Sequence, residues 1–224
     1  MTKFASPAVL RCPQCGDHVL RSRLKSFNDF GAMGWSDGYT SIWGLNAISP
    51  IGRCPWCKSV FWLDDAENMG SMPHKPSSIG LAMRLVYRLT GDKYGELERE
   101  RIWRETPWEW KSAKHVDAPM LNDWWSVLEN LNTLNPARGI LARRQLWWRG
   151  NDHLRIARDG KPISDKPKLD DQQIRGNLEE LYALSAAEEK PNLLAMGEML
   201  RELGRFDEAI ATLDSIEDDE ENTV

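Results

Sequence analysis

Apolar residues follow two different spacings along the chain, and the change falls near residue 65. Before it, residues 18–24 can form a strand, and residues 59–63 are a β-branched and aromatic run of the kind found in strands. Between them, residues 35–40 hold an Asp-Gly pair flanked by aromatic residues, which predicts a hairpin. The first part of the chain is therefore expected to form a small antiparallel sheet.

Beyond residue 78 the apolar residues recur every three or four positions, which is the spacing of amphipathic helices. Asn135 followed by Pro136 marks the start of one such helix, because asparagine caps helices well and proline is favoured at the first helical position. The helical spacing covers residues 79–89, 121–134, 136–148 and 171–187.

These patterns predict an α+β fold with a sheet region before an all-α domain of helical hairpins. Glycine, proline, serine and charged residues between the two regions indicate a linker. The expected bounds are 1–65 for the sheet region, 66–77 for the linker, 78–217 for the helical domain and 218–224 for an acidic tail.

All four cysteines of the chain fall into two equally spaced pairs, Cys12 with Cys15 and Cys54 with Cys57. Each pair has proline after its first cysteine, which presets the turn between the two sulfurs. Two Cys-x-x-Cys turns can bring four thiolates to one ion and close a tetrahedral site. The sequence predicts one structural zinc ion per chain. Free thiolates also favour a reducing, cytoplasmic location.

The two cysteine pairs, CPQCG and CPWCK, resemble the knuckles of the zinc-ribbon family. The resemblance implies a three-stranded antiparallel sheet with the ion at one end and the ligands at the tips of two short hairpins. It implies no particular function. Gly16 matches the family's glycine after the first pair, and Lys58 departs from it after the second.

Two other chemistries fit paired cysteines. Rubredoxin-like sites hold iron in four thiolates for electron transfer, and the ligand set by itself does not exclude iron. Rubredoxins, however, have a glycine after both pairs and stand as complete small proteins. A redox-active dithiol would need a single Cys-x-x-Cys at a helix start, which the strand-like surroundings here do not provide.

Thirty-eight residues separate the two cysteine pairs, more than a minimal ribbon needs. The excess, residues 27–50, is rich in glycine and aromatic residues. It is interpreted either as an exposed loop that binds a partner or as a lid over a sheet too small to bury itself. The candidate partner-binding residues are Phe30, Trp35, Tyr39 and Trp43.

Residues 190–216 resemble a tetratricopeptide repeat, with large residues on both predicted helices and Leu203-Gly204 at the turn. Gly197 and Ala209 stand where the repeat has small residues, and small residues let two helices approach closely. Ile216 departs from the pattern, and no proline closes the repeat at Glu221. The rest of the helical region repeats the motif only loosely, so either stacked hairpins or a single helical bundle fits.

The two regions also differ in net charge. Residues 1–63 carry a net charge of +4, and the remainder carries −9 within a total of −5. The basic residues Arg21, Arg23 and Lys25 on a predicted strand suggest nucleic-acid contact as an alternative, although the chain lacks the strongly basic character of a dedicated binder.

The remaining motifs favour a binding or scaffolding protein over an enzyme. The chain has no glycine-rich phosphate loop, no Gly-x-Ser-x-Gly and no His-Glu-x-x-His. We therefore expect another protein or peptide as the partner, with nucleic acid as the alternative, and no contact with a membrane.

Overall fold

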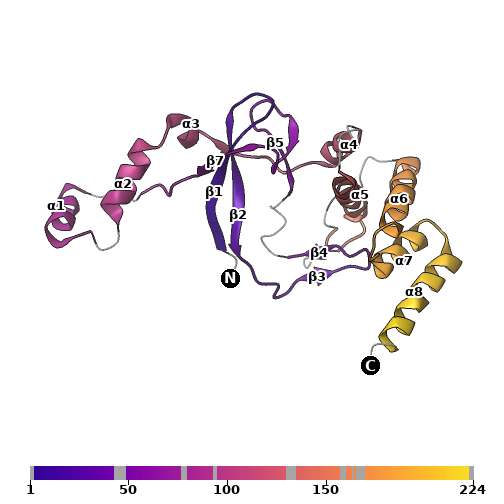
Figure 1. Ribbon diagram of the computed structural model, residues 1–224. Helices are drawn as coiled ribbons and strands as arrows, with labels where there is room; N and C mark the ends of the chain where they lie inside the picture. Colours follow the sequence, from indigo (N-terminus) through magenta and orange to yellow (C-terminus); the bar gives the residue numbers. More distant parts are fainter. Residues whose placement is uncertain are drawn as a thin grey trace. The chain divides into compact units, whose positions relative to one another are not determined.

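The computed structural model describes residues 3–42, 49–76, 80–92, 95–129, 135–156, 160–162, 164 and 170–221 (Figure 1). It is a mixed α+β protein, with most strands near the N-terminus and helices towards the C-terminus. The chain packs as two compact units: one comprises Met1–Asp29 and Trp43–Pro119, the other Phe30–Ile42 and Met120–Val224.

The first unit is built on a four-stranded sheet. Its central pair, β1 and β2, is antiparallel; β7 pairs with the other edge of β1, and β8 runs parallel to β2. The register of β1 shifts between Ala5 and Ala8, around Pro7, as expected because proline cannot donate a ladder hydrogen bond. The strands are Lys3–Arg11 (β1), His18–Ser26 (β2), Glu67–Ser71 (β7) and Lys114–His115 (β8).

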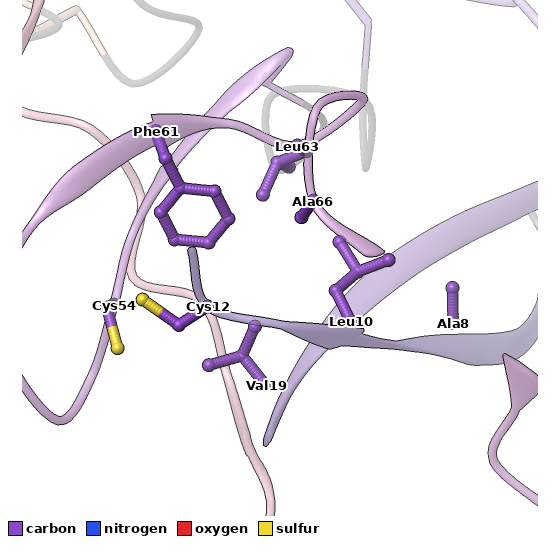
Figure 2. Packing of buried hydrophobic residues seen from close by; sticks show 8 residues of the cluster. All are labelled: Ala8, Leu10, Cys12, Val19, Cys54, Phe61, Leu63 and Ala66. Carbon is purple, nitrogen blue, oxygen red and sulfur yellow. The ribbon is translucent and has the colours of Figure 1, made fainter. Parts of the chain in front are cut away.

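A second hairpin of this unit pairs β5 (Ile51–Arg53) with β6 (Val60–Trp62), and Phe61 of β6 belongs to the same core as residues of β1 and β2. The core includes the two first cysteines of the pairs as well as apolar residues (Figure 2). Its members are Ala8, Leu10, Cys12, Val19, Cys54, Phe61, Leu63 and Ala66. The metal-ligand candidates are therefore part of the packing of this unit.

Three helices complete the first unit: α1 (Leu81–Thr90), α2 (Glu96–Glu105) and α3 (Trp108–Lys111). None of their described side chains is buried. An ion pair from Arg84 to Glu100 joins α1 to α2. These helices are therefore held by polar contacts more than by apolar packing.

The second unit holds the short hairpin β3 (Met33–Gly34) with β4 (Thr40–Ser41), as the Asp-Gly signal predicted. Local signals also place its helices. Asn135 caps α5 through a bond from the N–H of Ala137, and Asp170 and Gln173 form a capping box on α6. The helices are Leu121–Glu129 (α4), Pro136–Asn151 (α5), Asp171–Ala186 (α6), Leu193–Glu202 (α7) and Phe206–Glu221 (α8).

The β3–β4 hairpin is fixed to the helices by a buried polar cluster. The side chain of Asp37 forms an ion pair with Arg155, and the backbone oxygen of Asp37 accepts a bond from Trp148 Nε1 at 2.9 Å. Arg155 also donates to Asp152 at 2.6 Å and stacks 4.4 Å from the centre of the Tyr39 ring. Residues 30–42 thus belong structurally with helices that lie more than 100 positions further along the chain.

Three expectations about the arrangement of the chain are corrected here. The sheet has four strands instead of three, since β7 and β8 flank the predicted pair. Glu67–Ser71, inside the expected linker of residues 66–77, form strand β7 of that sheet. Residues 30–42 and 80–119 each lie in the unit other than the one their spacing suggested. Trp43, which belongs to the predicted loop of residues 27–50, lies outside the described residues.

Helices α7 and α8 form a close hairpin through the turn at Leu203-Gly204. A Cβ atom added to Gly197 would lie 2.6 Å from Leu213 Cδ2 and 2.7 Å from its Cγ, too close for van der Waals contact. The predicted close approach of the two helices is therefore present. Among the described residues, no helix is both long and apolar enough to cross a bilayer.

Replacing Gly197 by leucine should lower the free energy of unfolding by about 1–3 kcal/mol, because the new side chain has no space beside Leu213. Chemical denaturation followed by circular dichroism measures the change. Gly176→Ala is the matched control: a Cβ there meets no atom within 4 Å, so this helical position should gain up to about 1 kcal/mol. Equal effects of Gly197→Leu and Gly176→Ala would contradict the close packing of α7 on α8.

Candidate metal centre

Each cysteine pair occupies the turn of a hairpin in the first unit. Cys12 directly follows β1, and Cys15 lies just before β2. Cys54 directly follows β5, and Cys57 lies just before β6. The two hairpins therefore bring their tips, and the four sulfur atoms, to one place.

The two turns share the same backbone hydrogen bonds. In the first, the N–H of Cys12 donates to the oxygen of Asp17, and the N–H of Gly16 donates to the oxygen of Cys12, both at 2.9 Å. In the second, the N–H of Cys54 donates to Ser59 at 2.8 Å, and the N–H of Lys58 donates to Cys54 at 3.0 Å. Equal spacing in the sequence thus becomes equal backbone geometry.

Two of the sulfur–sulfur separations match the edge of a tetrahedral metal site. Cys12 Sγ lies 3.8 Å from Cys57 Sγ, and Cys15 Sγ lies 3.8 Å from Cys54 Sγ. All four lie within 4.8 Å of one another. A tetrahedron with metal–sulfur bonds of about 2.3 Å has sulfur–sulfur edges of about 3.8 Å. Four cysteines in this arrangement can hold a metal ion.

The cluster has a buried side and an exposed side. Cys12 and Cys54 are buried and adjoin Phe61 and Val19 in the core (Figure 2). Cys15 and Cys57 are exposed. With all four positions taken by protein sulfur, a bound ion would have no open site for a substrate, and structural metal sites are closed in this way.

Ser59 changes the pKa of one thiol of the cluster, that of Cys57. Its hydroxyl lies 3.0 Å from Cys57 Sγ, and the side-chain and backbone hydrogen bonds of Ser59 lower the pKa of Cys57 from 9.0 to about 6. Cys54 shows the opposite shift, because burial raises its pKa. For Cys15, the backbone hydrogen bond with Asp17 lowers the pKa. Desolvation and the neighbouring thiols raise it by more, so the pKa of Cys15 lies above its ordinary value. The metal-free cluster is thus expected to carry its first negative charge on Cys57.

Lys58 occupies the backbone conformation for which the first turn uses glycine. Its φ is 62°, and Gly16 at the equivalent position has φ 78°. Lys58→Gly should raise the free energy of unfolding by about 1 kcal/mol, because a left-handed conformation costs a side-chain-bearing residue about that much. Denaturant titration of the metal-loaded protein measures the gain.

Lys58→Ala is the control for the side chain of Lys58, since it removes the exposed ion pair with Asp117 (3.2 Å) but keeps the strained backbone. Exposed pairs contribute less than about 1 kcal/mol, so alanine should be neutral or slightly destabilising. The backbone argument fails if glycine stabilises no more than alanine does.

The aromatic candidates of residues 27–50 lie in different surroundings. Tyr39 is buried, stacks on Trp35 and meets the edge of the Trp148 ring. Trp35 is half-buried, whereas Phe30 is 96% exposed. Trp43 lies outside the described residues. Of the four, Phe30 alone is described as fully open to a partner, and Tyr39 and Trp35 pack the hairpin onto the helices instead of covering the sheet.

The basic candidates of β2 are mostly engaged within the protein. Arg21 pairs with Asp64 at 2.5 Å, and Arg23 donates to Ser71 Oγ at 3.1 Å. Lys25 is exposed. Two of the three charges proposed for phosphate contact thus have partners of their own, and one of these partners is acidic.

A serine–histidine contact also lies in this unit. Ser22 Oγ is 3.3 Å from His115 Nδ1, beside a cavity of about 240 Å³ that Arg21 and Asp117 also line. Within the described ranges, His115 contacts no carboxylate that would orient it as a general base, and nucleophilic catalysis depends on such a third group. The contact joins β2 to β8.

Sequence reasoning located the four cysteines and overlooked Ser59. The signal for it was present, since a hydroxyl two positions after the last cysteine can reach that sulfur. No family model, curated protein or solved structure matches this chain. What is shown for the site is therefore its geometry: four cysteines close enough to hold a metal ion.

Proposed function

We propose that this chain is a non-catalytic protein–protein interaction or scaffolding protein whose first unit is held together by a structural metal ion. The observation that carries the proposal is the spacing of the exposed apolar side chains along two helices. They lie on α1 at Met83, Leu85, Val86 and Leu89, and on α8 at Phe206 and Ile210. Apolar residues spaced three or four apart on an exposed helix face are typical of surfaces that bind another protein.

Zinc is the metal that we assign to the cysteine centre, with one ion per chain. Support comes from four thiolate ligands, the 3.8 Å sulfur–sulfur edges and a closed site partly inside the core. The paired hairpin turns support a zinc-ribbon identity for this part of the chain. A ferric centre of rubredoxin type would have the same ligands but would absorb visible light, so a colourless metal-loaded protein excludes it.

The α7–α8 hairpin supports a tetratricopeptide-like unit, because Gly197 lets Leu213 approach as the repeat requires. Helical hairpins of this kind bury their faces against neighbouring hairpins, and a terminal one exposes a face. A cytoplasmic location is part of the proposal, since a reducing compartment keeps the four thiols available as ligands.

Affinity capture with the intact, metal-loaded protein tests the interaction function. Immobilised wild-type protein should retain at least one protein, which can be another copy of the chain, from an extract of the cells that express it. The double variant Leu89→Glu with Phe206→Glu should lose it, since both residues are exposed members of the two apolar faces. Leu194→Glu, on the exposed side of α7, is the matched control. Retention of no protein at all by the wild type would refute the proposed function.

A further inference from the structure

Helix α1 turns the side that carries Arg84 towards α2 and its apolar side outward. Arg84 pairs with Glu100 of α2, and Arg84 and Tyr87 are the half-buried side chains of this helix. Leu85 and Leu89, one turn apart, are 61% and 78% exposed. Ordinary surface helices bury the apolar side, so this orientation leaves α1 without the packing that normally stabilises a helix.

The length of α1 makes the missing packing significant. It has ten residues, and isolated helices shorter than about 12–15 residues are marginal in water even with good helix formers. Its sequence contains two arginines and no acidic residue. Arg88 is exposed beside Leu85 and Leu89, and the described residues hold no ion pair to it. The surface that covers α1 should therefore be apolar at its centre and acidic at its margin.

Helix α8 presents such a surface. Phe206 and Ile210 follow one another at one-turn spacing and are 60% and 58% exposed. Leu213, the next residue of this stripe, is 37% exposed and contacts α7 beside Gly197. Ala209 of the same helix is buried, and Phe206 and Ile210 lie beside that buried face, on the exposed part of α8.

The charge of α8 complements that of α1. Its sequence contains eight acidic and no basic residues. Asp207 and Asp214 stand three and four positions from Ile210, which places them beside the stripe. Both are exposed, and neither has a cationic partner within the part of the chain that is described.

We propose that α1 of one copy docks on α8 of a second copy of this chain, apolar stripe on apolar stripe, with Arg88 facing Asp207 and Asp214. The proposal rests on the interaction function given above and names the partner. Two different surfaces meet in this contact, so it is heterologous, and two copies joined in this way retain a free α8 on one copy and a free α1 on the other. Association should continue into rings or chains whose mass grows with concentration.

Two single substitutions turn this property into a test. Leu85→Glu disables α1 and leaves α8 intact, and Ile210→Glu does the reverse; both positions are exposed, so folding should be preserved. Each variant alone should be monomeric. An equimolar mixture should form a heterodimer of twice the monomer mass and nothing larger, because it contains one functional α1 and one functional α8. Light scattering after size-exclusion chromatography gives the masses, and metal content and circular dichroism verify folding.

Charge exchange within the same mixture tests the role of the ionic residues. Arg88→Asp in the Ile210→Glu copy should weaken the heterodimer about ten-fold or more, and Asp207→Arg with Asp214→Arg in the other copy should restore it. Raising the salt concentration should weaken the unmodified pair and leave its stoichiometry unchanged. Leu194→Glu should associate as the wild type does.

Several results would overturn the proposal. They are a monomeric wild type at all concentrations, a monomeric mixture, or self-association of Ile210→Glu alone, which would mean that α1 pairs with α1. Binding of the wild type to phosphatidylserine-containing vesicles, with a monomeric mixture, would assign α1 to a lipid surface instead. A monomeric mixture together with capture of a different protein refutes only the second copy as partner, whereas failure of both experiments refutes the interaction function too.

Discussion

Cys54→Ser is expected to release the metal ion and unfold the first unit. Structural zinc contributes about 10 kcal/mol or more to the folding of small zinc domains, and whole domains have a net stability of only about 5–15 kcal/mol. Cys54 is fully buried and adjoins the apolar core, so its loss removes a ligand and places a hydroxyl among apolar side chains. Metal analysis should fall from one ion per chain to a small fraction, and thermal unfolding should lose its cooperative transition for this unit.

Two controls separate the metal from the core around it. Ala66→Ser places a hydroxyl in the same cluster without removing a ligand and should cost only about 1–3 kcal/mol, with metal content unchanged. A strong chelator added to the wild type should reproduce the Cys54→Ser unfolding. Unchanged melting of Cys54→Ser, or free reactive thiols in the purified wild type, would show that the centre is not a structural metal site.

Arg155→Ala should lower the free energy of unfolding of the second unit by about 3–5 kcal/mol, the usual cost of removing one partner of a buried ion pair. The Arg155 side chain is 3% exposed, and its guanidinium lies between the carboxylates of Asp37 and Asp152. Alanine would leave two buried carboxylates facing each other and remove the cation stacked on Tyr39. Guanidinium denaturation followed by tryptophan fluorescence measures the loss.

Arg149 supplies the matched control, since it pairs with the same Asp152 at 3.3 Å but is 36% exposed. Arg149→Ala should cost less than about 1 kcal/mol, because partly solvated ion pairs contribute little. Similar losses for Arg149→Ala and Arg155→Ala would mean that the contribution of Arg155 to the free energy of unfolding does not depend on its burial.

Features governed by neighbouring residues could be predicted from the sequence. The cysteine turns, the Asp-Gly hairpin and the helix start at Asn135 all depend on contacts within a few positions, so their signals are complete in a short window. The close contact of Gly197 with Leu213 belongs to the same class, since both residues lie in one helical hairpin.

Features that depend on distant partners could not be predicted in this way. Strand β7 has the sequence ENMGS, which lacks the alternation of a strand and forms one because β1 offers its edge. Residues 30–42 are rich in glycine and aromatic residues, which suggested a loop. Their place in the fold depends on the ion pair of Asp37 with Arg155, 118 positions later. A single arginine in a sequence with many gives no signal that it will be buried beside two aspartates.

The position of the β3–β4 hairpin determines how the protein can be divided for experiments. The hairpin lies between the two cysteine pairs in sequence, yet it packs with the helices of the second unit. A fragment ending at residue 119 would contain every metal ligand but would expose Trp35, Tyr39 and an unpaired Asp37. A fragment beginning at residue 120 would lack the partner of Arg155. No single cut yields two intact folding units, and excising residues 30–42 would also remove the partner of Arg155, so experiments on either unit need the whole chain.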